Sequence, residues 1–217
     1  MDKQKVVIYG GGGFAREVAW LVECCDAGKG AYEVACFVDD DEAAHGKLLN
    51  GIPVMSLQVA REQFPTARMV GGVGVPKTRQ SVIGKAARAG FSFCTLVHPN
   101  VERSRWVEIG EGTIVCAGSL LTTNIIIGRH VQLNLDCTVG HDVRIGDFAT
   151  LAPGVHLSGW VHIGERVYIG TGAVIINGTK DTPMQIGDDA VIGAGACVIK
   201  PVPPGTTVVG VPARPTT

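Results

Sequence analysis

Apolar residues recur every six positions through residues 97–180. Stepping in sixes from Val97 reaches fourteen positions, of which thirteen are aliphatic and one, Arg103, is not. The position four residues after each step is again small or apolar, as at Cys137. The repeat is interrupted at residues 181–185 and restarts at Ile186. A period of six fits neither the 3.6-residue period of a helix nor a series of hairpin strands.

Such a period is typical of a parallel β-helix, in which each hexad forms one short flat face and three hexads close one triangular coil. We therefore expect the stepping residues to point into the prism. Eighteen residues per coil predict a little under five coils, each rising about 4.8 Å. Glycine and asparagine suit corners that need a positive φ. The expected corner residues are Gly118, Asn124, Asn134, Gly154, Gly172 and Gly178.

The first part of the chain has a different pattern. Residues 5–9 form an apolar, β-rich run, residues 10–13 are four glycines, and residues 14–22 have helical apolar spacing. A second strand is expected at 32–38, and three aspartates follow it at 39–41. This order is half of a dinucleotide-type fold, with backbone N–H groups that can approach an anionic group at the helix start. The alternative is a tight turn that binds nothing, and the segment is too short for a doubled Rossmann fold.

Further elements complete an α/β domain. We expect an edge strand at 51–54, a buried strand at 68–73, a helix at 78–89 and a last strand at 91–97. The basic residues near the start and middle of that helix, Arg79 among them, are expected to be exposed. The predicted domains are therefore a half-Rossmann-like α/β domain over 1–96 and a β-helix over 97–217.

Composition and charge narrow the classes of partner that the protein is expected to bind. Nineteen basic against twenty acidic residues give a net charge of −1, which does not favour nucleic-acid binding. Aromatic residues make up only 6% of the chain and glycines number 30, as suits a solenoid with many corners. No apolar run reaches the length of a membrane span, and no signal-peptide pattern begins the chain. We expect a soluble, cytoplasmic protein without a membrane partner.

The seven cysteines do not form a C-x-x-C pair. Cys137 falls at an inward hexad position, and Cys36 and Cys94 lie in apolar, strand-like runs. We interpret all seven as small hydrophobic residues in a reducing compartment rather than as nucleophiles or ligands.

The hexads of the form [LIV]-G-x-x-[small]-x resemble those of the hexapeptide-repeat acyltransferases, and this resemblance implies left-handed coils. An α/β domain that begins Y-G-G-G-G-F-A-R-E-V and runs directly into such a β-helix resembles a narrower group. That group is the bacterial sugar acetyltransferases of the sialic-acid O-acetyltransferase type, including N-acetyltransferases of nucleotide-linked 4-amino sugars. The resemblance implies acetyl-CoA as co-substrate and a homotrimer with active sites between neighbouring subunits.

His141 is the candidate catalytic residue. It stands third in its hexad, near a corner, and acyl transfer needs a base with a pKa near neutrality. By the resemblance, the histidine of this hexad is catalytic and the acid that follows it, here Asp142, orients it. A histidine on a solenoid surface that is merely solvated is the alternative. No histidine lies one coil above or below another, which counts against a zinc site, and we expect no metal.

The resemblance also implies ligand contacts. A backbone N–H, with Gly159 as the candidate, would hold the oxyanion. Acetyl-CoA would lie near Thr150, Gly159, Thr171 and Asn177, with Lys200 and Arg214 meeting its phosphates. The nucleotide sugar would use Gly12, Gly13, Phe14, Asp39 and Asp40.

Two departures from the family pattern leave the acceptor open: many relatives have histidine where this chain has Phe14, and the acid after the catalytic histidine is often glutamate rather than Asp142. Three hypotheses remain. The first is N-acetylation of the 4-amino group of a nucleotide-linked amino-deoxy sugar by direct transfer. The second is O-acetylation of a sialic acid or another sugar. The third is a non-catalytic trimeric β-helix that binds or scaffolds.

Overall fold

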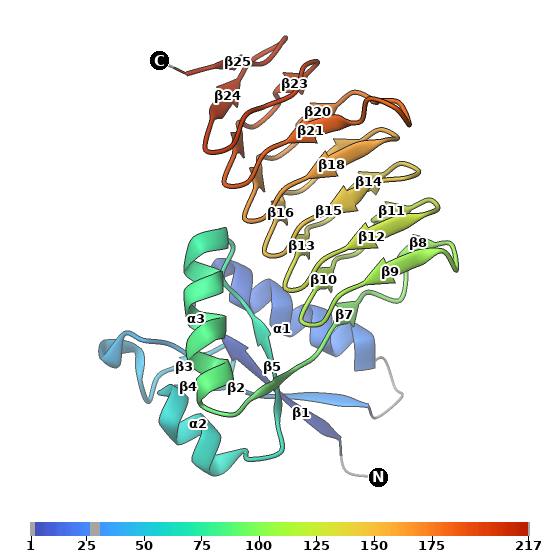
Figure 1. Cartoon of the computed structure of the whole chain (residues 1–217). Coiled ribbons are helices and arrows are strands. Elements are labelled where there is room, and N and C mark those ends of the chain that lie inside the picture. Colours follow the sequence, from blue (N-terminus) through green and yellow to red (C-terminus); the bar gives the residue numbers. More distant parts are fainter. Residues whose placement is uncertain (1–2, 27–30, 217) are drawn as a thin grey trace. The chain divides into compact units, whose positions relative to one another are not determined.

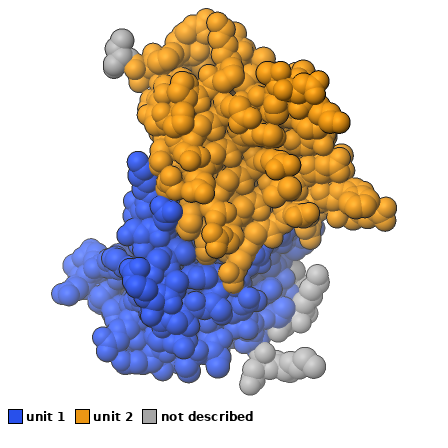
Figure 2. Space-filling model, in the orientation of Figure 1, with its two compact units in different colours: residues 1–99 blue, residues 100–217 orange. Residues whose placement is uncertain are grey.

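The computed structural model describes residues 3–26 and 31–216. The chain divides into two compact units, residues 1–99 and residues 100–217, shown in two colours in Figure 2.

The first unit is built on a six-stranded sheet with the order β3-β4-β2-β1-β5-β6. The central strand β1 pairs in parallel with both β2 and β5. The strands are β1 (Gln4–Tyr9), β2 (Tyr32–Val38), β3 (Leu48–Leu49), β4 (Ile52–Met55), β5 (Arg68–Gly71) and β6 (Ser92–Phe93), followed by β7 (Leu96–Val97). The helices are α1 (Gly13–Asp26), the short 3₁₀ helix η1 (Glu42–Ala44), α2 (Leu57–Gln63) and α3 (Pro76–Arg88).

Most of the predicted elements of this unit are confirmed: β1, α1, β2, β5 and α3 lie where the pattern placed them. The strand predicted at the edge, now β4, is instead covered by β3, which pairs with it antiparallel. The last strand is split into β6 and β7, and α2 was not predicted. Gly72 lets the sheet and α1 approach closely, since a Cβ there would lie 2.7 Å from Ile8 Cγ2 and 2.9 Å from Ala15 Cβ.

The prediction that Arg79 is exposed is wrong. The side chain is 1% exposed and packs against Gly71, where a Cβ would lie 3.2 Å from its methylene carbons. Its guanidinium donates from Nη1 to the carbonyl oxygens of Val73, at 2.9 Å, and Gly74, at 3.1 Å. Burial lowers the pKa of Arg79 to about 9, so the group is still a cation at neutral pH. Arg79 therefore holds the loop between β5 and α3 from inside the domain.

The second unit is a left-handed parallel β-helix, whose coils stack from β8 to β25 in Figure 1. One face stacks β10 (Ile114–Val115), β13 (Gln132–Leu133), β16 (Thr150–Leu151), β19 (Tyr168–Ile169), β22 (Val191–Ile192), β24 (Thr207–Val209) and the antiparallel β25 (Arg214–Pro215). The next stacks β8 (Glu102–Arg103), β11 (Leu120–Leu121), β14 (Thr138–Val139), β17 (His156–Leu157), β20 (Val174–Ile175) and β23 (Cys197–Val198). The third stacks β9 (Val107–Ile109), β12 (Ile125–Ile127), β15 (Arg144–Ile145), β18 (Val161–Ile163) and β21 (Met184–Ile186).

The stepping residues fill the prism as predicted: from Val115 to Ile175 each is at most 4% exposed. Polar residues at inward positions are hydrogen-bonded to the backbone, as Thr113 Oγ1 is to the carbonyl of Gly128 at 2.8 Å. Cys137 is fully buried in the core, and burial raises the pKa of its thiol to about 11. This agrees with its interpretation as a small hydrophobic residue.

The coil length is eighteen residues until the predicted interruption. Thr138 pairs with His156, eighteen residues later, whereas Val161 pairs with Met184, twenty-three later. The five extra residues form a loop before β21, closed by a hydrogen bond from the N–H of Thr179 to the carbonyl of Thr182 at 3.0 Å. The parallel ladder continues on both sides of this loop.

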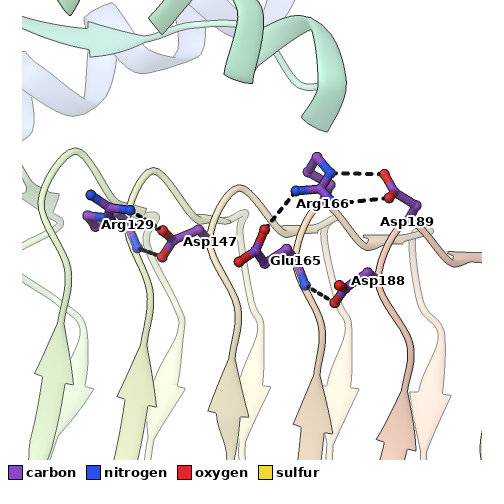
Figure 3. A network of polar contacts seen from close by, with 6 residues as sticks. All are labelled: Arg129, Asp147, Glu165, Arg166, Asp188 and Asp189. Atoms are coloured by element: carbon purple, nitrogen blue, oxygen red, sulfur yellow. Dashed lines mark hydrogen bonds and ion pairs between the residues drawn. The ribbon is translucent and has the colours of Figure 1, made fainter. Parts of the chain in front are cut away.

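Ion pairs join successive coils at the corners that precede the first face (Figure 3). The guanidinium of Arg129 donates to Asp147 at 2.8 Å, and that of Arg166 donates through two nitrogens to Asp189, each at 3.0 Å. The N–H of Glu165 is capped by Asp188 at 2.8 Å. Partly exposed pairs of this kind are each worth about 0–1 kcal/mol, so they fix the corners more than they stabilise the fold.

The buried arginine provides a test of the first unit. We expect Arg79→Ala to lower the free energy of unfolding of this unit by about 2–4 kcal/mol, because it opens a cavity and leaves two carbonyls without their donor. Arg88→Ala, at an exposed position of the same helix, is the matched control and should change it by less than about 0.5 kcal/mol. Urea denaturation followed by circular dichroism measures both. Equal effects would contradict the structural role of Arg79.

Candidate active site

His141 and Asp142 occupy the corner between β14 and β15. Asp142 adopts a left-handed conformation with φ 58°, which turns the chain from one face to the next. At the same corner of the neighbouring coils lie Thr123 and Gly159, as the eighteen-residue spacing predicts: the N–H of Asp142 donates to Thr123, and that of Trp160 donates to His141. Corner side chains point away from the filled core, so His141 is 56% exposed.

The two residues are hydrogen-bonded. His141 Nδ1 lies 2.8 Å from Asp142 Oδ2, and the Asp142 side chain is 26% exposed. An ionised carboxylate only accepts, so this contact assigns the proton of the neutral ring to Nδ1 and leaves the lone pair on Nε2. Asn124 Nδ2, one coil away, lies 3.4 Å from Asp142 Oδ1. The arrangement presents Nε2 as a proton acceptor, and the hydrogen bond between Nδ1 and Asp142 orients the ring.

Gly159 lies directly over the His141 ring. A Cβ at this position would be 2.5 Å from both Cε1 and Nε2 of His141, so only glycine lets the ring occupy its place. Gly159 is buried, and its N–H has no hydrogen-bond partner in the part of the chain that the structure describes. A buried N–H group without a partner, beside the lone pair of a histidine, is positioned to stabilise negative charge on a reacting oxygen.

Trp160 belongs to this site and was not predicted from the sequence. Its ring meets that of His141 edge-on, with centroids 6.4 Å apart and an interplanar angle of 85°. Its φ is 57°, a conformation that costs a bulky residue on the order of 1–2 kcal/mol. The signal in the sequence was its position, eighteen residues after Asp142, where a corner normally carries glycine or asparagine.

A groove of about 590 Å³ runs beside this corner, along the third face of the β-helix. We call it the corner groove and define it by Trp106, Asn124, Asp142, Arg144, Trp160 and Lys180. Lys180 comes from the loop that precedes β21. His162 also lines the groove, and its pKa is lowered by burial and by the neighbouring Arg144.

The residues predicted to hold acetyl-CoA are only partly brought together. Asn177 lies at the His141 corner, one coil beyond Gly159, and the N–H of Gly178 donates to Gly159 at 3.1 Å. Thr150 instead lies in β16 with 2% exposure, and Thr171 lies at the corner after β19. Lys200 and Arg214 line one cavity of about 290 Å³ near the end of the β-helix.

The glycines predicted to bind the nucleotide sugar lie at the start of α1. Gly12 and Gly13 are exposed, and a Cβ at Gly12 would meet nothing within 4 Å, so a ligand can approach the backbone there. Phe14 follows in the first turn and is partly exposed. Gly10 has φ 127°, a conformation available almost only to glycine, which directs the chain from β1 into the helix.

The aspartates after β2 have different surroundings. Asp39 Oδ2 lies against Gly11, where a Cβ would be 2.7 Å away. Asp40 accepts from the hydroxyl of Tyr9 and from Lys85 Nζ, each at 2.6 Å. Its pKa is lowered mainly by the hydrogen bond from Lys85, and burial together with Asp40 raises the pKa of Tyr9. Asp39 is therefore next to the glycine turn, whereas both oxygens of Asp40 are already engaged.

Within residues 3–26 and 31–216, no group of three or more histidine, cysteine or acidic side chains is arranged to hold a metal ion. No helix of the described chain has both the length and the apolar character needed to cross a membrane.

Both units match known protein families. Residues 5–86 match the PglD N-terminal domain family, and residues 142–177 match the bacterial transferase hexapeptide family of six repeats. The chain is 37% identical over 215 residues to the GDP-perosamine N-acetyltransferase of Escherichia coli O157:H7, a match that covers 95% of the chain and 94% of that protein.

Solved structures agree. PerB from Caulobacter crescentus, in complex with CoA and GDP-perosamine, matches with a TM-score of 0.87 and 34% identity over 98% of this chain and 97% of that one. The acetyltransferase domain of PglB from Neisseria gonorrhoeae FA1090, in complex with acetyl coenzyme A, matches with a TM-score of 0.85 and 31% identity. That match covers 99% of this chain and 100% of the PglB domain.

The packing of Gly159 on His141 can be tested directly. We expect Gly159→Ala to push the His141 ring off its position and lengthen the contact with Asp142, because the new methyl group would overlap the ring. The ring is the free end of a flexible side chain, so the melting temperature should fall by no more than about 4 °C. A crystal structure of the variant and a thermal scan measure the two effects. An unmoved ring would contradict the proposed contact.

Proposed function

Since the chain belongs to the family of hexapeptide-repeat acetyltransferases with a PglD-type N-terminal domain, and is an acetyl-CoA-dependent acetyltransferase, we propose that it acetylates the amino group of a nucleotide-linked amino-deoxy sugar. The observation that carries this proposal is the match over 95% of the chain to a GDP-perosamine N-acetyltransferase, which includes both units. The hydrogen-bonded pair of His141 and Asp142 supplies the chemistry.

In the proposed mechanism the acceptor amine attacks the thioester carbonyl carbon of acetyl-CoA directly. His141 Nε2 accepts the proton that the nitrogen loses as the new C–N bond forms. The tetrahedral intermediate then collapses, the C–S bond breaks, and the same proton passes from His141 to the sulfur of CoA. No acetyl-enzyme forms, so a single base serves both halves of the reaction.

Asp142 and Gly159 are proposed to assist in different ways. Asp142 keeps the proton of neutral His141 on Nδ1 and stabilises the imidazolium that forms when Nε2 is protonated. The N–H of Gly159 donates to the oxygen of the tetrahedral intermediate, where an oriented donor is worth about 3–4 kcal/mol of barrier. The Asn124 amide, 3.4 Å from Asp142, helps to hold the carboxylate.

Acetyl-CoA is proposed to approach His141 from the coils above it, past Gly159 and Asn177. Lys200 and Arg214 would meet its phosphates, which is supported by their position on one shared cavity. Thr150 is 2% exposed and offers a ligand little contact. Thr171 lies at a different corner from His141, and it would take part only if a neighbouring subunit of the proposed homotrimer brought its own copy to the site.

The nucleotide is proposed to bind the first unit. Gly12, Gly13 and Phe14 would place the first N–H groups of α1 against the diphosphate, where the helix dipole favours negative charge. Asp39, beside the glycine turn, would accept from ribose hydroxyls. Asp40 would act through Lys85, whose ammonium group it holds. A GDP-linked sugar is the first candidate, because GDP-perosamine is named for two of the matched proteins.

A panel assay tests this function. Acetyl-CoA consumption should be measured by thiol release with GDP-perosamine, with UDP- and dTDP-linked 4-amino-6-deoxy sugars and with free sialic acid. We expect turnover of a nucleotide-linked amino sugar, and a fall in kcat of about a hundredfold or more in His141→Ala without loss of folding, because the general base is removed.

Each outcome decides between the hypotheses. Turnover of sialic acid alone would replace the proposal with O-acetylation. Acetyl-CoA binding without turnover of any acceptor, or an equally active His141→Ala, would contradict the mechanism. Absence of acetyl-CoA binding would favour a scaffold.

The role of Asp142 is tested by Asp142→Asn. The amide keeps the shape of the side chain but can donate to Nδ1 and so favours the opposite tautomer of His141, which places a proton on Nε2. We expect kcat to fall about ten- to a hundredfold or more with the KM for acetyl-CoA unchanged. Asp142→Glu, which restores the carboxylate, should recover most of the loss. Equal rates in Asp142→Asn and the wild type would contradict an orienting role.

A further inference from the structure

Trp160 holds an unfavourable backbone conformation at a place where the fold does not require a side chain. Its φ is 57°, and the equivalent residues one and two coils before it are Asp142 and Asn124, residue types that tolerate this region well. The backbone is fixed on both sides: the N–H of Trp160 donates to His141 at 3.0 Å, and its carbonyl accepts from Met184 at 2.9 Å. Phe148 and Arg166 hold the same left-handed conformation at other corners, with φ 61° and 55°, so the conformation belongs to the corner and the aromatic side chain beside His141 is what distinguishes Trp160.

The ring of Trp160 has a specific environment. One edge meets His141 at a centroid distance of 6.4 Å, and the ring also lines the corner groove beside Asp142. It is only partly buried, so the indole is not a core residue. An aromatic ring that is left partly open, next to the proposed base, offers its apolar surface to whatever reacts there.

The polar groups around the groove narrow the occupant. Next to Trp160 the groove presents a carboxylate at Asp142, an amide at Asn124 and a guanidinium at Arg144. These donor and acceptor groups line the same groove as the Trp160 ring, and Asp142 is also hydrogen-bonded to His141 and Asn124. A polyhydroxylated ring matches this pattern, because its hydroxyl groups both donate and accept while its C–H groups pack on an aromatic surface. The alkyl chain of a thioester cofactor would offer no hydrogen-bond acceptor to the Arg144 guanidinium.

We propose that Trp160 is a specificity-determining residue, the aromatic wall against which the sugar ring of the acceptor packs in the corner groove. The proposal rests on the proposed function and extends it by assigning the sugar, rather than the nucleotide or acetyl-CoA, to this groove. Because the Trp160 ring meets the His141 ring edge-on, a sugar held against Trp160 would lie next to His141. The backbone strain at this corner is then the consequence of placing an aromatic side chain where the sugar must be held.

The test compares Trp160→Gly with Trp160→Phe. Glycine adopts a positive φ without strain, so we expect Trp160→Gly to fold with an unchanged or higher melting temperature. Its KM for the amino-sugar nucleotide should rise about tenfold or more, since an apolar contact is lost, while its KM for acetyl-CoA stays within about twofold. Trp160→Phe keeps an aromatic wall and should restore the acceptor KM to within about threefold of the wild type.

Several results would overturn this assignment. An unchanged KM for the acceptor in Trp160→Gly would show that the sugar does not pack against Trp160. An equal rise in the KM for acetyl-CoA would place the cofactor there instead. A lower kcat with both KM values unchanged would mean that Trp160 acts on His141 alone. If Trp160→Gly does not fold, the strain argument fails, and Trp160→Asn gives the same kinetic comparison because asparagine tolerates this conformation. Wild-type turnover is established first, so failure of the proposed function is recognised separately.

Discussion

The β-helix depends on the backbone hydrogen bonds that each coil makes with the next. A face contributes only two or three residues per strand, too few to be stable alone. The N–H of Thr138 donates to Val155 and the N–H of His156 donates to Ala173, each at 3.0 Å, and the same step continues along the prism. This ladder requires small or aliphatic residues inside and turn-forming residues at the corners. It places little restriction on the side chains that project outward, and the candidate site is located there.

Much of the fold follows from the sequence because burial constrains one residue in six so strongly. The stepping residues and the small residue four places after each must all face inward, and only one winding of the coils satisfies this condition. Cys137 is buried as its hexad position predicts. Arg79 could not be predicted in this way. Its burial depends on two carbonyl groups of the β5–α3 loop and on the lack of a side chain at Gly71, none of which alters the polar appearance of arginine in a helix.

The residues of the candidate site likewise divide into those that the sequence predicts and those that it does not. His141 and Asp142 are adjacent in the chain, so their pairing could be expected, and Gly159 follows by adding one coil length. Thr150 is nine residues after His141, one and a half hexads, and therefore lies on another face. The corner position of Trp160 could be read from its spacing, eighteen residues after Asp142, but its edge contact with the His141 ring one coil away could not, because the hexad pattern does not give the direction of a corner side chain.

The five extra residues before β21 have a wider consequence. The ladder passes from an eighteen-residue to a twenty-three-residue step without loss of register, since Ile145 pairs with Ile163 and Ile163 with Ile186. Lengthening a surface loop adds little closure entropy. The edge of the prism that carries His141 can thus accept new segments while the coils stay unchanged. Insertions at this edge can therefore remodel the surroundings of the His141–Asp142 corner independently of the scaffold.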